Sequence, residues 1–197
     1  DQATVHISEV EGKGFYTIQE PEMNEVEHAL YKLIMIYLYY SLKPAPSTED
    51  PIGYVRQFMW EAADEIGIRD EVEEISDKLL YYIHRDSIGY GIVDTPIRDP
   101  GVEEVECGGA NVPVTIVHRD YTEFWRLPTN VVFPSEDRVA AYVQKLAQKG
   151  GRSVTVAQPF ADFMLPEGHR VAVTYSNEIS LPGSTFDTRK FPQAPLT

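Results

Sequence analysis

The stretch LPEGHRVAVTYSNEISLPGSTFDTRKF, residues 165–191, decides the architecture of the second half of the chain. A Pro/Gly turn precedes an alternating apolar run at 169–175, and a second Pro-Gly pair precedes another alternating run at 184–190. This pattern predicts two β-strands. If they pair as an antiparallel hairpin, the start of the first strand and the end of the second lie at the same edge.

That edge would carry two arginines, Arg170 from the first strand and Arg189 from the second. Two guanidinium groups held side by side form a permanent positive fork suited to a phosphate. Alternatively, each arginine pairs with a carboxylate, because surface ion pairs are common in an acidic chain. The residues alone leave both roles open. Lys190 should point to the opposite face of the strand and is expected to be a surface charge.

Upstream of this hairpin the chain again shows strand-like alternation, interrupted by one amphipathic helix. The predicted elements are strands at 103–107, 112–118, 124–133 and 154–156, with a helix at 136–149. This predicts an α+β subdomain over 99–190, a mostly antiparallel sheet with one covering helix.

The first half has helical periodicity instead. Helices are predicted at 21–43, 51–66 and 71–85, which gives a three-helix subdomain over 20–88. Residues 1–19 are expected to form an N-terminal extension, with short strands around the Glu-Gly-Lys-Gly sequence at 11–14. A Gly- and Pro-rich stretch at 86–100 joins the two subdomains.

Charge and composition exclude several classes of function. The 197 residues carry a formal net charge of −14, which argues against a nucleic-acid partner, because a phosphate backbone would be repelled. The single cysteine, Cys107, cannot form an internal disulfide and is expected to be structural. The histidines lack metal-site spacing, so no metal ligand is predicted.

No catalytic residue is predicted within this chain. Two His-Arg-Asp words, at 84–86 and 118–120, lack the asparagine spacing and glycine-rich loop of a protein kinase. No GxxxxGK[ST] motif occurs, so the chain alone is not expected to turn over ATP.

The most apolar run, residues 29–42, contains a lysine and is too short to span a bilayer. It is expected to be a core helix buried on most faces, the alternative being a helix that rests on a membrane. Before it lie Glu20, Glu22, Glu25 and Glu27. They are either a docking surface for basic loops or the solvated start of a helix. No signal peptide is apparent.

Several sequence words occur in an order that resembles a known family. They are LLYYIHRDSIGYG, DPGVEEVECGG, VPVTIVHRDY, LPTNVVF, QPFADFMLPEG, LPEGHRV, IS..GSTF and TRKF, the last followed by FPQAPLT. Over residues 15–197 the chain resembles the N-terminal region of type II/type IV secretion ATPases, and is most similar to the archaeal branch that includes the archaellum motor ATPase.

The resemblance implies that the second subdomain is PAS-like and that residues 191–197 are a linker to an absent P-loop ATPase domain. It implies that Arg170 and Arg189 contact nucleotide phosphate, with ATP and Mg²⁺ bound in the full-length protein and no cofactor in this chain. The implied partners are that ATPase domain, a homohexamer and a polytopic inner-membrane platform protein, so the location would be cytoplasmic and peripheral to the membrane. The chain would couple ATP hydrolysis to that platform. The alternatives are a stand-alone PAS-like ligand-binding module and a non-enzymatic docking scaffold.

Overall fold

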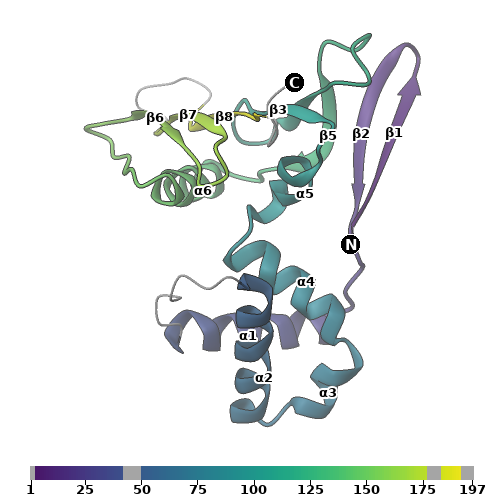
Figure 1. Cartoon of the computed structure of the whole chain (residues 1–197), viewed down its shortest axis with the longest axis vertical. Helices are drawn as coiled ribbons and strands as arrows, with labels where there is room; N and C mark the ends of the chain where they lie inside the picture. The colour runs from purple at the N-terminus through teal and green to yellow at the C-terminus, as the bar shows by residue number, and fades with distance from the viewer. Residues whose placement is uncertain (1–2, 42–49, 177–182, 192–197) are drawn as a thin grey trace. The chain divides into compact units, whose positions relative to one another are not determined.

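The computed structural model of the chain describes residues 3–41, 50–176 and 183–191 (Figure 1). The chain divides into two compact units. The first consists mainly of Glu20–Asp94 and is helical. The second combines Val5–Gln19 with the chain from Thr95 onward and contains the sheet. The fold is therefore α+β.

The helical unit buries one continuous apolar core. Its elements are α1 (Glu25–Ser41), α2 (Pro51–Ile66), α3 (Arg69–Glu74), α4 (Ser76–Ser87) and the short 3₁₀ helix η1 (Gly91–Val93). The core is formed mainly by Ile34, Leu38, Val55, Met59, Ala62, Ala63, Val72, Leu79, Leu80 and Ile83. The apolar run at 29–42 thus contributes Ile34 and Leu38 to this core. Within the described residues, no helix has the length and apolar character needed to cross a membrane.

Helix α1 differs from its prediction at its start and on its outer face. It begins at Glu25 rather than at Pro21, because Asn24 and Glu27 cap it reciprocally: the Glu27 N–H donates to Asn24 Oδ1 at 2.9 Å, and the Asn24 N–H donates to Glu27 Oε2 at 2.8 Å. The helix is also not buried on most faces, since Ile36 and Tyr40 are exposed. Helix α2 has the predicted bounds, and Gly67 ends it in the left-handed conformation.

The predicted third helix, 71–85, is two helices. Ile75 leaves the helical region, with φ −125° and ψ 18°, and its N–H donates to the Val72 carbonyl three residues back, which ends α3. The Ile75 carbonyl then accepts the Leu79 N–H as α4 begins. This break lets both Val72 and Leu79 enter the same core.

The second unit is an open, mixed, mostly antiparallel eight-stranded sheet. Its strands are β1 (Thr4–Val10), β2 (Lys13–Gln19), β3 (Val102–Cys107), β4 (Pro113–His118), β5 (Leu127–Val132), β6 (Phe160–Met164), β7 (Arg170–Thr174) and β8 (Thr185–Arg189). Their spatial order is β1-β2-β5-β4-β3-β8-β7-β6. Strands β7 and β8 form the antiparallel pair predicted from residues 165–191. A short helix, α5 (Asp94–Arg98), precedes β3.

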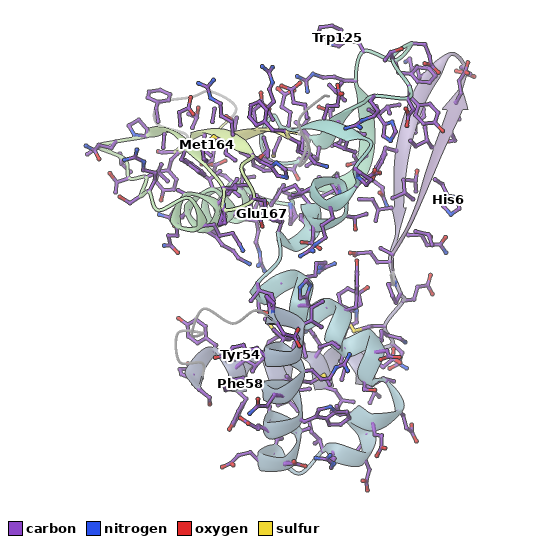
Figure 2. All side chains as sticks on the ribbon, viewed as in Figure 1. His6, Tyr54, Phe58, Trp125, Met164 and Glu167 are labelled. Carbon is purple, nitrogen blue, oxygen red and sulfur yellow. The ribbon has the colours of Figure 1, made fainter. Side chains whose placement is uncertain are left out.

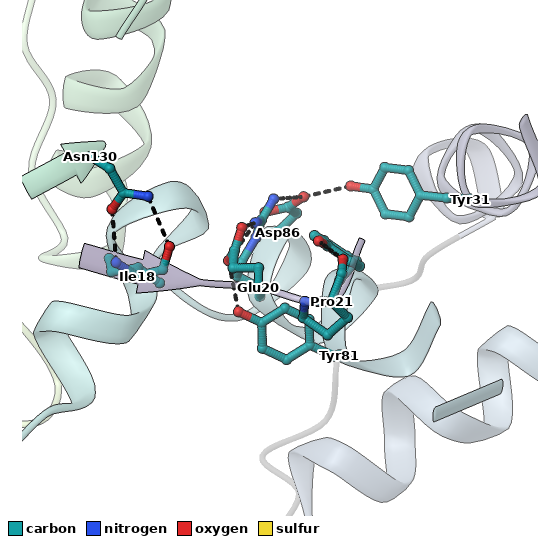
Figure 3. A network of polar contacts seen from close by, with 9 residues as sticks. Ile18, Glu20, Pro21, Tyr31, Tyr81, Asp86 and Asn130 are labelled. Carbon is teal, nitrogen blue, oxygen red and sulfur yellow. Dashed lines mark hydrogen bonds and ion pairs between the residues drawn. The ribbon is translucent and has the colours of Figure 1, made fainter. Parts of the chain in front are cut away.

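The first two strands belong to the sheet unit rather than to a separate extension. A turn at Glu11 and Gly12, both with positive φ, connects β1 to β2. Strand β2 then lies parallel to β5, with Tyr16 paired to Thr129. The Asn130 side chain accepts the Ile18 N–H and donates to the Ile18 carbonyl, each at 2.8 Å, and so extends this pairing (Figure 3).

One predicted strand was misplaced by several residues. At 154–156 the chain forms a tight turn, in which Thr155 and Gln158 exchange backbone hydrogen bonds of 3.1 and 3.0 Å. The strand that joins the sheet is β6, Phe160–Met164, which pairs along its whole length with β7. It is an edge strand among the described residues, because none of their other strands follows it in the sheet order.

The two faces of the sheet differ in cover. Helix α6 (Glu136–Lys149) packs on one face, where Val139, Val143 and Leu146 are buried together with the β7 and β8 residues Val171 and Phe186 (Figure 1). Alternate residues of each strand lie on the opposite face of the sheet. On that face Met164 of β6 is exposed (Figure 2). The candidate site lies on this open face.

Candidate functional site

Arg170 and Arg189 are direct cross-strand neighbours. Residue Arg170 at the start of β7 pairs with Arg189 at the end of β8, as the hairpin predicts. Residues opposite each other in an antiparallel pair share a face, so both guanidinium groups project from the open side of the sheet. Their side chains are 60% and 68% exposed, so both arginines are accessible to a ligand from solvent.

The sheet arranges charged residues in rows around this pair. Arg170 and Arg189 share one row with Glu104 of β3, which is paired with Arg189. The next row on the same face contains Asp162 and Asp187, each paired with Ala172 of β7. The open face therefore places a row that contains two arginines beside a row of carboxylates.

Arg170 is held by a bidentate ion pair with Asp162. Its Nε lies 3.1 and 3.2 Å from the two carboxylate oxygens, and its Nη2 lies 2.5 Å from Oδ2. The hydrogen bond from Arg170 lowers the pKa of Asp162 below its usual value and correspondingly raises the pKa of Arg170. Both side chains are more than half exposed, so this ion pair contributes little to stability.

Arg189 is held much more loosely. Its Nη2 lies 3.5 Å from Glu104 Oε1, beyond the range of a strong charged hydrogen bond. Glu104 instead accepts a hydrogen bond of 3.0 Å from Arg126, whose other nitrogen lies 2.8 Å from Glu106. Because Arg126 occupies these carboxylates, Arg189 retains most of its capacity to donate hydrogen bonds.

Asp187 completes the acidic side of the site. Burial, followed by the neighbouring charges of Glu104 and Glu106 and opposed by Arg126, raises its pKa to about 6. Within the described part of the chain, its buried Oδ1 has no hydrogen-bond partner. The surroundings of Asp187 therefore favour its protonated form more than water does.

A cavity of about 610 Å³ lies over β6, β7, β8 and the end of β3, and Asp162 and Asp187 of the acidic row line it. Its lining includes one aromatic ring, three carboxylates and two hydroxyl groups, from Phe160, Asp162, Asp187, Glu106, Thr174 and Thr185. The cavity thus offers an aromatic ring and hydroxyl groups next to the acidic row. No set of three or more His, Cys, Asp or Glu side chains within residues 3–41, 50–176 and 183–191 is arranged to hold a metal ion.

The prediction that Lys190 is a surface charge was wrong. Its Nζ donates to the backbone carbonyls of Asp99 and Pro96, the second at 3.4 Å, and burial together with the nearby Arg119 charge lowers its pKa to about 8. The strand alternation was read correctly, but the loop after α5 covers this face at the end of β8. Lys190 therefore anchors the end of the sheet to that loop.

The first His-Arg-Asp word forms a structural ion-pair cluster in the helical unit (Figure 3). Arg85 Nη1 lies 2.7 and 2.6 Å from the oxygens of Glu20, and its Nε and Nη2 lie 2.7 and 2.9 Å from those of Asp86. Tyr31 donates to Asp86 at 2.6 Å, and Tyr81 donates to Glu20 at 2.7 Å. Burial opposes the charge, but these carboxylates raise the pKa of Arg85.

The four glutamates near α1 have separate roles. Glu20 binds Arg85, and Glu27 both caps α1 and accepts a hydrogen bond of 2.7 Å from Lys78. Glu22 and Glu25 are exposed. Only these last two are free to form a docking surface of the kind expected from the sequence.

Cys107 and His118, two further residues considered in the sequence analysis, are both buried. The Cys107 thiol is buried and lies 3.6 Å from the Gly109 carbonyl, and burial raises its pKa, so the thiolate is disfavoured. His118, in the second His-Arg-Asp word, is buried, and its Nδ1 accepts the Asp120 N–H at 3.2 Å.

No protein-family model matches the sequence. The chain is 31% identical over 223 residues to an uncharacterized protein of Methanocaldococcus jannaschii, a match that covers all of this chain and 39% of that protein. A second uncharacterized protein of the same organism is 33% identical over 125 residues, covering 57% of this chain and 48% of the relative. A third is 29% identical over 196 residues, covering 98% and 26%. The chain thus spans less than half the length of each of these relatives.

Among solved structures, the chain is similar to the VirB11 ATPase of the Brucella suis type IV secretion system, crystallised in complex with sulphate. The match covers 52% of this chain and 32% of that chain, with a TM-score of 0.39 and 16% identity. A likeness at this level supports no inference about the function of this chain.

Proposed function

We propose that this chain is the N-terminal region of a secretion-type ATPase and that Arg170 and Arg189 contact the phosphates of ATP. The observation that carries the proposal is the direct cross-strand pairing of these two exposed arginines. Further support comes from the ordered sequence words over residues 15–197 and from the length of the relatives outside the matched region.

The arginine pair is unusual in energetic terms. Like charges placed directly opposite each other on neighbouring strands repel and destabilise the sheet. Within the part of the chain that the structure describes, Arg170 has one carboxylate partner, and Arg189 has only a distant, shared one. A phosphate between the two guanidinium groups would relieve the repulsion, because its oxygens can accept hydrogen bonds from both. ATP is the proposed ligand because its terminal phosphate offers several charged oxygens at one exposed end.

A P-loop domain elsewhere in the full-length protein would bind the nucleotide and Mg²⁺. In this proposal Arg170 and Arg189 stabilise the charge on the terminal phosphate and lose their ligand when it leaves. The loss changes how the two domains are held together. This chain would therefore transmit hydrolysis to a partner rather than carry out the chemistry itself.

The proposed partner is a polytopic membrane platform protein, contacted by a homohexamer that lies peripherally on the cytoplasmic side of the membrane. Glu22 and Glu25 supply exposed negative charge near the start of α1, and the same helix presents Ile36 and Tyr40 to solvent. Basic loops with apolar flanks would match this surface. A PAS-like ligand-binding module is less well supported, because Phe133, Tyr142 and Phe186 pack together beneath the sheet, with ring centroids 5.0–6.0 Å apart.

The test is ATP hydrolysis by the full-length protein carrying Arg170→Ala or Arg189→Ala. Each change should reduce the rate by roughly 100-fold or more if the arginine acts in the transition state. Arg152→Ala is the matched control, since it removes an exposed arginine from the same unit and should leave the rate unchanged. Unchanged hydrolysis in both site variants would refute the proposal.

A further inference from the structure

The ion pair between Arg170 and Asp162 occupies the N–H groups that a phosphate would need. Arg170 presents Nε and Nη2 together to the carboxylate, which is the same bidentate geometry that guanidinium groups use for phosphate oxygens. A carboxylate and a phosphate therefore cannot both occupy this side of Arg170. Binding of an anion there requires Asp162 to move away.

Among the described residues, Arg189 has no comparable restraint, because Glu104 is 3.5 Å away and is engaged by Arg126. The two arginines thus differ in how readily they can bind an anion, although they are direct cross-strand neighbours. An incoming anion can reach Arg189 without displacing a short hydrogen bond. It reaches the Nε/Nη2 edge of Arg170 only by exchange with Asp162.

We propose that Asp162 is an exchangeable internal counter-ion of Arg170, so that ligand binding begins at Arg189 and is completed when phosphate replaces the Asp162 carboxylate. The inference rests on the proposed phosphate site and explains why that site would prefer phosphates to simple carboxylates. Asp162 is on the neighbouring strand β6, and both side chains project from the same open face. It returns to Arg170 when the phosphate leaves, which reduces the repulsion within the unliganded pair.

This arrangement selects the class of ligand. A free carboxylate carries the same charge as Asp162 but must compete with a carboxylate that is already attached to the protein, and tethering gives Asp162 a high effective concentration. An anion with several negative charges gains more from two guanidinium groups than one carboxylate does from Arg170 alone. The site is therefore expected to accept a diphosphate or triphosphate end and to reject simple carboxylates.

The test is a calorimetric titration of the 197-residue chain with inorganic pyrophosphate and, separately, with acetate at low salt. Asp162→Asn removes the competing charge while retaining the size of the side chain. It should tighten pyrophosphate binding about three- to tenfold and make acetate binding measurable. Glu123→Gln, which neutralises an exposed carboxylate in the loop between β4 and β5, is the matched control and should behave as wild type.

Unchanged or weaker pyrophosphate binding by the Asp162→Asn variant would overturn the counter-ion role. Two further variants separate this failure from failure of the phosphate site itself. If Arg170→Ala and Arg189→Ala weaken binding but Asp162→Asn does not tighten it, the site stands and the exchange is refuted. If neither arginine variant alters pyrophosphate binding, both proposals are refuted. Equal thermal midpoints verify that each variant is folded.

Discussion

Arg85 and Arg170 are both held by carboxylates in bidentate geometry, yet the structure uses them differently. Arg85 is only 10% exposed and is fixed between Glu20 and Asp86, while its guanidinium lies 4.7 Å from the centre of the Tyr82 ring. Arg170 has Asp162 on one side and solvent on the other. An ion pair alone therefore does not show whether an arginine is structural. Burial and the number of fixed partners separate the two cases.

The largest expected effect is on the buried arginine. Arg85→Ala leaves the carboxylates of Glu20 and Asp86 without their shared cation, so the free energy of unfolding should fall by about 3 kcal/mol. Arg170→Ala should change it by less than about 0.5 kcal/mol, because the exposed pair contributes little. Urea unfolding of both variants checks the contrast. Equal destabilisation by the two changes would contradict the distinction drawn here.

A smaller effect concerns the acidic side of the open face. The folded-state pKa of Asp187 is raised to about 6, so the folded protein binds this proton more tightly than the unfolded chain does. Its contribution to stability is present at low pH and is lost as pH rises through about 6. Asp187→Asn should therefore flatten the pH dependence of stability between about pH 4 and 7 and stabilise the protein by roughly 1 kcal/mol at pH 7.

Thermal unfolding of wild type and of the Asp187→Asn variant at several pH values measures this difference. Asp120→Asn is the control, since Asp120 is exposed on the loop after β4. Parallel pH profiles for wild type and the Asp187→Asn variant would show that Asp187 titrates normally. The same result would contradict the claim that burial and the neighbouring carboxylates of the open face raise the pKa of Asp187.

The division into a helical part and an α+β part and the β7–β8 hairpin could be predicted from local patterns, but the surroundings of the arginines could not. The alternation around Val171 and Phe186 indicated the β7–β8 pair, and that pairing correctly brought Arg170 next to Arg189. Asp162 was missed as a partner because its strand, β6, was not recognised: the predicted strand lay at 154–156, where the chain turns. Without the β6–β7 register, nothing in the sequence connects residues 162 and 170.

Other differences arose where tertiary contacts decide local structure. The break at Ile75 lies within an uninterrupted helical pattern, and it appears only when α3 and α4 must both supply residues to one core. Lys190 was assigned to the correct side of its strand, but a covering loop buries that side. The start of α1 was misplaced at Pro21 for a different reason: the local signal of an Asn followed three residues later by a Glu, Asn24 and Glu27, was overlooked.

The most direct test of the central claim compares the arginines of the two units in one experiment. Side-chain Nε–Hε signals of the isotope-labelled chain can be followed by NMR during titration with inorganic pyrophosphate. The signals of Arg170 and Arg189 should shift together and saturate with a common dissociation constant, whereas the signal of Arg85 should remain unchanged because its hydrogen bonds are already made within the unit. Shifts of equal size at Arg85 and at the exposed control Arg152, or no shift at Arg170 and Arg189, would contradict the assignment of this pair as the phosphate site.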